Sequence, residues 1–359
     1  MKKKKNAGKK LTRKELLLRI GLIALAVILV LAAAVFGVMN YVLDRIGSGE
    51  TQPVETVPPH LEDFETDPPA TDATGDATNP SDDATEPTGE SADPDAIIWP
   101  EVEQLKSDAV INIMLIGQDA RPGEKQTRAD TMILVSINKK TNAIHMTSFM
   151  RDLYVQIPGG YSDNRLNAAY RFGGSELLNE TIQLNFGITV DGNVTVGFEQ
   201  FEKVINVLGG VDVSLTAEEA DYMNKNLNVG TVTEGVNHLD GNQALQFCRI
   251  RKIGSDFGRT ERQRRVLTAV ANSFKGAEFA TLMGIVNDVL PYVHTNLSDG
   301  EIVSYATAAI TAFVSGGSIQ NGRVPQNGHF EYRTIRNMSI LLPDLIKCNE
   351  YLKNTIYGG

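Results

Sequence analysis

The chain has 359 residues, a formal net charge of −10 and 42% hydrophobic residues. This length leaves room for two domains of average size. There are two cysteines and five scattered histidines, without a CxxC or HExxH motif or a Cys/His cluster. The composition therefore argues against a structural or catalytic zinc site.

The N-terminus has the pattern of a membrane anchor. Residues 1–19 form a basic tail, and the uncharged stretch 20–43 follows it. As a helix this stretch would span about 36 Å, which is enough to cross a bilayer. It exceeds the usual length of a signal-peptide core and lacks a convincing small-residue cleavage site, so we favour an uncleaved transmembrane helix. The basic flank predicts a single-pass type II protein of the cell membrane, with the chain after residue 43 outside.

Residues 46–95 have the composition of a disordered tether. They contain 14 Asp and Glu, eight Pro and no Lys or Arg. Such a segment cannot bury enough apolar surface to fold. It is therefore expected to hold the folded part, residues 96–359, away from the membrane.

The folded part alternates predicted strands and helices. Apolar runs rich in β-branched residues at 110–117, 131–137 and 143–149 predict three buried strands. Further strands are expected at 189–196, 211–215 and 330–335, and helices at 175–185, 198–208, 240–247, 258–275, 298–313 and 342–351. This alternation predicts an α/β fold with a mixed β-sheet and helices on both faces.

The first three strands predict where charged residues gather. If they form an up-down-up meander, the end of the first, the start of the second and the end of the third share one edge of the sheet. That edge would carry Asp119, Arg121, Arg128, Asp130, Arg151 and Asp152.

A second charged group lies between residues 247 and 265, where seven Lys and Arg accompany two carboxylates. Arg249 and Arg251 would point to one side if that piece is extended. In the following helix Arg259, Arg262 and Gln263 share a face. Arginines in the first turn oppose the helix dipole, whereas a bound phosphate would favour them there. The alternative is a solvated basic helix, which is what we expect of Arg264 and Arg265.

Two carboxylates complete the predicted site. Asp119 and Asp130 each have an arginine two positions away, which should keep them ionised. Carboxylates together with phosphate oxygens commonly hold Mg²⁺. A surface network of salt bridges is the alternative. The sequence has no glycine-rich phosphate loop, so arginines and a metal would have to bind any phosphate.

Several motifs occur in an order that resembles the LytR-CpsA-Psr family of cell-wall glycopolymer transferases. They are LIGQDARPGEKQTRADTMILVSIN, SFMRDLYVQIPG, RLNAAYRFGG, VLGGVDV, LDGNQALQFCRIR and DFGRTERQRRVL. The resemblance covers roughly residues 108–275. Departures from the usual family pattern are small, at Gln118 and Met150, and the region after residue 280 has no counterpart that we can match.

The resemblance implies a domain that binds a polyprenyl-pyrophosphate-linked glycan, with the lipid in an apolar cavity. The glycopolymer would pass to a muramic acid hydroxyl of peptidoglycan with the help of Mg²⁺. Asp119, Asp130 and Arg151 would be catalytic, and both aspartates would bind the metal. The pyrophosphate would contact Arg121, Arg128, Arg249, Arg251, Arg259, Arg262 and Gln263.

Other functions remain possible from the sequence. One is hydrolysis of the lipid pyrophosphate without transfer, and another is a non-catalytic glycan-binding scaffold. A membrane-anchored transcriptional attenuator would need to meet DNA, and export of the domain argues against a nucleic-acid partner. The sequence does not name the polymer, which could be teichoic acid or a capsular polysaccharide. It also leaves open whether Cys248 and Cys348 form a disulfide.

Overall fold

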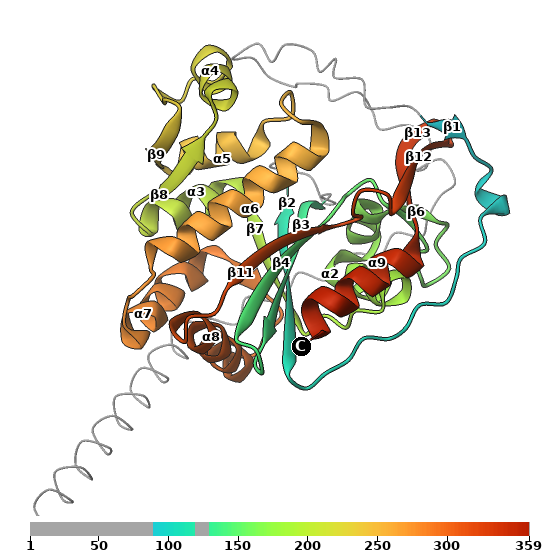
Figure 1. The fold of residues 1–359 in the computed structure, drawn as a ribbon, viewed down its shortest axis with the longest axis horizontal. Coiled ribbons are helices and arrows are strands. Elements are labelled where there is room, and N and C mark those ends of the chain that lie inside the picture. The colour runs from blue at the N-terminus through green and yellow to red at the C-terminus, as the bar shows by residue number, and fades with distance from the viewer. Residues whose placement is uncertain (1–88, 119–128, 359) are drawn as a thin grey trace, which may run out of the picture. The chain divides into compact units, whose positions relative to one another are not determined.

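The computed structural model describes residues 89–118 and 129–358 (Figure 1). The predicted basic tail, the predicted transmembrane helix and most of the predicted tether lie outside these residues. Among the residues that are described, no helix is both long and apolar enough to cross a bilayer.

A six-stranded mixed sheet forms the centre of the fold, in the order β10-β7-β2-β3-β4-β11. The strands β2 (Val110–Gln118), β3 (Ala129–Asn138) and β4 (Ala143–Phe149) are antiparallel neighbours, which confirms the predicted meander. β7 (Gly192–Gly197) runs parallel to β2, and β11 (Ile319–Val324) runs parallel to β4. The short β10 (His294–Thr295) completes the other edge.

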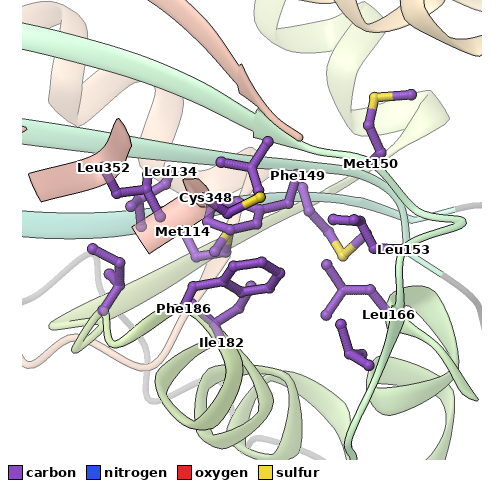
Figure 2. Packing of buried hydrophobic residues seen from close by; sticks show 14 of the residues in the cluster. Met114, Leu134, Phe149, Met150, Leu153, Leu166, Ile182, Phe186, Cys348 and Leu352 are labelled. Atoms are coloured by element: carbon purple, nitrogen blue, oxygen red, sulfur yellow. The ribbon is translucent and has the colours of Figure 1, made fainter. Parts of the chain in front are cut away.

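Helices α2 (Leu166–Phe186) and α9 (Leu345–Leu352) cover one face of the sheet. Alternate strand residues such as Met114 and Leu134 pack there against Ile182 and Phe186 of α2 (Figure 2). The rings of Phe149 and Phe186 meet edge to face, with their centroids 5.1 Å apart. This geometry suits the opposite charges of a ring's edge and face.

Helix α8 (Asp299–Val314) covers the other face, which carries the intervening strand residues. Ile111, Ile113 and Ile137 are buried there against Ala312. The predicted capping box at Ser298 and Glu301 is present and begins this helix. Helices on both faces confirm the predicted α/β layers.

A second hydrophobic cluster lies among the elements after β7. These are α3 (Phe198–Val207), β8 (Val211–Leu215), α4 (Ala217–Asn226), β9 (Gly235–Leu239), α5 (Gly241–Arg249) and α6 (Ser255–Ser273), and α7 (Phe279–Val289) follows them. Cys248 is buried in this cluster, whereas Cys348, on α9, is buried in the core that α2 and α9 form with the sheet. Both thiols are free, so the two cysteines form no disulfide.

Short strands and a small sheet complete the described fold. β12 (Phe330–Ile335) and β13 (Met338–Pro343) are antiparallel, and β1 (Glu90–Ser91) adds to β12 in parallel. Two-residue strands β5 (Tyr154–Val155) and β6 (Asn164–Arg165) form a pair of their own. The amide of Leu341 in β13 donates to the carbonyl of Asp152, 2.9 Å away, which links the small sheet to the end of β4.

Three predicted boundaries were wrong. Residues 89–95 of the predicted tether belong to the fold, because Glu90–Ser91 complete the small sheet. The last helix begins at Leu345, three residues later than predicted, because β13 occupies the preceding positions. Helix α6 begins at Ser255, which places the acidic Asp256 in its first turn, where the helix dipole favours an anion.

Candidate functional site

The edge of the sheet that carries the site contains a β-bulge. Gly117 of β2 pairs with Thr131 of β3, and the next residue, Gln118, pairs with Ala129. Asp130 lies between these two partners and is therefore the extra residue on β3. Bulges re-aim side chains and are common beside functional sites. Here the bulge places Asp130 next to Arg151, which follows the end of β4.

The carboxylate of Asp130 lies between two arginines. Its Oδ1 accepts a hydrogen bond from Nη1 of Arg151 at 3.0 Å, and its Oδ2 is 3.6 Å from Nη2 of Arg251. Arg251 comes from the connection between α5 and α6. Its side chain is 46% exposed, compared with 22% for Arg151. Segments far apart in the sequence thus meet at one carboxylate.

Arg259 of α6 lies behind this pair and is buried. Its Nη2 donates to the backbone carbonyl of Asp130 at 3.2 Å and is 2.6 Å from Oδ1 of Asp256. The same Asp256 oxygen is 3.7 Å from Nε of Arg151. The Nε and Nη1 of Arg259 and the Oδ2 of Asp256 are buried without a hydrogen-bond partner among the described residues. Buried polar atoms without a partner are uncommon and mark places where a ligand or water can bind.

The arginines determine the protonation of Asp130. Burial alone would raise the pKa of its carboxyl, but the charges of Arg151, Arg259 and Arg251 outweigh burial and lower the pKa. Burial lowers the pKa of Arg259 to about 10, against the opposing charge of Asp256. Asp130 is therefore ionised and Arg259 cationic at neutral pH.

Two acidic residues beside this cluster were not among the predicted catalytic or binding residues. Asp152, predicted only to lie at this edge, has Oδ2 at 3.3 Å from Nε of Arg151 and Oδ1 at 3.5 Å from Nε of Arg165. Burial raises the pKa of Asp256, although the charges of Arg259 and Arg151 oppose that rise. The spacing of Asp256 three residues before Arg259 was the sequence signal for this pair.

Some predicted residues are not brought to the cluster. Arg262 is 2% exposed, and its guanidinium donates to the backbone carbonyls of Ile250 and Ile253. Gln263, on the same helix, makes no hydrogen bond to the cluster in the described part of the chain, and its Oε1 is buried without a partner there. Asp119, Arg121 and Arg128 lie outside the described residues.

The second charged group, residues 247–265, also differs from the prediction in its conformation and in the exposure of its arginines. Arg249 is the last residue of α5, so 249–251 is not an extended piece, and its guanidinium lies over the ring of Phe198, 4.7 Å from the centroid. Arg264 and Arg265 are not simply solvated. Arg264 is buried and donates to Ser148, while Arg265 pairs with Glu219 at 2.8 Å.

The sheet face that carries α8 leaves apolar side chains partly accessible. Leu115, Val135 and Val194 on the strands and Tyr305 on α8 are only partly buried there. Two of these strands, β2 and β3, also lead to the site edge. Partly exposed aliphatic side chains beside a cationic cluster can accommodate a ligand with an apolar chain and a charged head.

Chemically, the cluster is suited to phosphate. Arginine presents a planar fork of donors that can bind two phosphate oxygens at once. Arg151, Arg251 and Arg259 provide three such groups around one ionised carboxylate. Among the described residues, no group of three or more His, Cys, Asp or Glu side chains is arranged to hold a metal ion. The fold and the cluster together define an α/β domain with a cluster of arginines around a carboxylate at one edge of its sheet.

The chain belongs to the LytR_cpsA_psr family, which it matches over residues 73–344. It is 38% identical over 199 residues to a protein of Oceanobacillus iheyensis named polyisoprenyl-teichoic acid–peptidoglycan teichoic acid transferase TagU, covering 53% of this chain and 60% of the relative. A protein of the same name from Bacillus mycoides is 30% identical over 234 residues, covering 64% of this chain and 73% of that protein. Among solved structures, B. subtilis TagV is similar with a TM-score of 0.58 and 27% identity, covering 71% of this chain and all of that one.

Proposed function

We propose that this protein transfers a glycopolymer from a polyprenyl-pyrophosphate carrier to peptidoglycan, forming a phosphodiester link. The observation that carries the proposal is the convergence of Arg151, Arg251 and Arg259 on the ionised Asp130. The names of the TagU relatives support the substrate class, with teichoic acid as the polymer.

In the proposed reaction an acceptor hydroxyl of peptidoglycan attacks the phosphorus that bears the glycan. The bond from that phosphorus to the bridging oxygen breaks, and prenyl phosphate leaves. Arg151, Arg251 and Arg259 would stabilise the negative charge that develops on the leaving phosphate. Asp130 would accept the proton of the hydroxyl, because its carboxylate is ionised and partly exposed.

The prenyl chain would lie on the sheet face that carries α8. Partly exposed apolar side chains such as Leu115 and Val135 support this placement, because they lead along β2 and β3 toward the charged edge. Burial of each methylene of the chain in such a place contributes about 0.8 kcal/mol to binding.

We also propose Mg²⁺ as the cofactor. The ionised, partly exposed carboxylate of Asp130 fits a hard cation that keeps some of its waters and shares phosphate oxygens. Asp119, the second expected ligand, lies outside the described residues. The ion would add positive charge at the pyrophosphate when bound.

The proposed location is the outer side of the cell membrane, with residues 20–43 as the anchor. The basic flank before this apolar stretch and the acidic segment after it support a type II orientation. Reporter fusions at each end of the chain test it. Activity of an external reporter at the N-terminus, or of a cytoplasmic one at the C-terminus, would contradict this orientation.

The test of function compares two variants for glycan transfer and for prenyl lipid retained through purification. Asp130→Ala should abolish transfer while lipid is retained, because the arginines that bind phosphate remain. Arg251→Ala should weaken both retention and transfer, because it removes charge from the ground state and the transition state alike.

Product analysis separates the outcomes. Equal loss of lipid from both variants would show that Asp130 mainly organises binding, and full transfer by Asp130→Ala would remove it from the chemistry. Release of phosphate without a glycan–peptidoglycan product from the wild-type protein would favour hydrolysis over transfer.

A further inference from the structure

The segment 250–254, which connects α5 to α6, carries the most exposed arginine of the site. Ile250 caps the end of α5, and Arg251 extends from the next position to Asp130. No regular element contains this segment, because α6 begins only at Ser255. Something other than helical hydrogen bonding must therefore fix the direction in which Arg251 leaves the backbone.

Arg262 supplies that restraint. From the eighth residue of α6, its Nη2 donates to the carbonyl of Ile250 and, at 2.9 Å, to the carbonyl of Ile253. These two carbonyls flank Arg251, so one guanidinium holds the backbone on both sides of it. The contacts also place a positive charge at the C-terminal end of α5, where the helix dipole favours a cation.

Glu219 holds Arg262 from the other side. Its Oε1 lies 3.6 Å from Nη1 of Arg262, and both side chains are almost fully buried. Glu219 is fixed in turn by the capping box with Thr216 at the start of α4 and by Arg265. Burial would raise the pKa of Glu219, but hydrogen bonds from Arg265 and the Thr216 backbone, together with nearby arginine charge, lower it. A buried anion therefore faces the buried Arg262.

Gly258 leaves the space that this arrangement needs. A β-carbon at this position would lie 2.7 Å from the carbonyl oxygen of Ile253 and 3.4 Å from Nη1 of Arg262. The first of these separations is too short for a real contact, and the atom concerned is backbone. Any side chain at 258 would therefore displace the segment that carries Arg251.

We propose that Arg262, held by Glu219, is a positioning residue that directs Arg251 at the substrate phosphate. The role rests on the proposed transfer reaction. It assigns to Arg262 a structural link to the site in place of the direct phosphate contact that the sequence predicted.

The test measures transfer by Arg262→Gln, by Arg251→Ala and by the double variant. Loss of the restraint misdirects Arg251, so Arg262→Gln should lower kcat/KM roughly 10- to 100-fold. Arg262→Gln acts only through the position of the Arg251 guanidinium, and Arg251→Ala removes that guanidinium. The double variant should therefore be little worse than Arg251→Ala alone. Gly258→Ala should reproduce the loss without removing a charge.

Arg265→Gln is the matched control. Arg265 also pairs with Glu219, but its other hydrogen bond goes to Ser214 and not to the 250–254 segment. It should lower the temperature of unfolding and leave kcat/KM within about twofold of the wild type, because the Thr216 capping box still fixes Glu219 and Arg262 still holds the carbonyls of the segment.

The outcomes separate this inference from the proposed function. Additive losses in the double variant, or an equal loss of transfer in Arg265→Gln, would overturn the positioning role while wild-type transfer still stands. If Arg262→Gln does not fold, the same double-mutant cycle with Arg251→Ala is measured with Arg262→Lys and with Gly258→Ala. Absence of transfer by the wild-type protein would instead refute the proposed function.

Discussion

Asp256 is the innermost acidic residue of the site and the partner of its most buried arginine. Its side chain is 6% exposed and that of Arg259 is 3% exposed, with 2.6 Å between Oδ1 and Nη2. The second oxygen of Asp256 has no partner among the described residues. Asp256 thus supplies the nearest counter-charge to the buried guanidinium of Arg259.

Replacement of Asp256 by Asn should therefore destabilise the fold and not only the reaction. The change leaves a buried guanidinium without its counter-charge, which costs about 3–5 kcal/mol. Urea unfolding measures the loss. Asp221→Asn is the control, because its ion pair with Lys225 is on the surface and contributes about 0.3–0.5 kcal/mol. Losses of similar size in the two variants would show that burial of the pair has no such effect.

For single residues, the sequence predicted which charged side chains belong to the site region, but not always where each of them points. Asp130, Arg151 and Arg259 meet because strand ends and one helix face fix their positions, and Arg251 reaches them from the connection between α5 and α6. Arg262 turns away because its partner Glu219 belongs to α4. The spacing of the arginines along α6 gives no sign that a carboxylate of α4 pairs with one of them.

Among the elements, β1 shows how a short piece of chain extends the fold beyond its predicted limit. Glu90 and Ser91 pair with Arg333 and Thr334 of β12. The amide of Ala92 donates to the carbonyl of Thr334 at 3.0 Å, and the Thr334 hydroxyl donates to the carbonyl of Gly89 at 3.1 Å. The acidic, proline-rich composition concealed this strand, because two residues give no alternation to detect.

A protein that begins at residue 96 should be less stable than one that begins at residue 89. It lacks these hydrogen bonds, each of which contributes about 0.5–1.5 kcal/mol, so the expected loss in the free energy of unfolding is about 1–3 kcal/mol. Thermal and urea unfolding of the two proteins measure it. Both retain the hydrogen bond from Trp99 to Asp163, which serves as an internal control. Identical midpoints would show that β1 adds nothing to the fold.

For the whole molecule, the mixed sheet and its helical layers could be predicted because the apolar runs from 110 to 149 are long and their connections short. The sequence did not predict that the core under α2 and the cluster among α3, α5 and α6 are separate. Their separation follows from how α3, α5 and α6 pack together, and it is the reason that Cys248 and Cys348 remain apart. Sequence distance carries no information about that packing.

The parallel pairing of β1 with β12 has a mechanical consequence for the molecule. A force applied through the chain before residue 89 reaches β1 first. The next described side-chain hydrogen bond to the rest of the fold is that of Trp99 to Asp163, at 2.7 Å. Detachment of residues 90–98 would release roughly 30 Å of chain, at up to about 3.3–3.6 Å per residue, while the sheet and the arginine site stay folded. In a single-molecule pulling experiment this should give a short extension at low force before the main unfolding event. A single event without that early step would contradict it. The strand would thus detach before a pulling force on the N-terminal side distorts the arginine cluster.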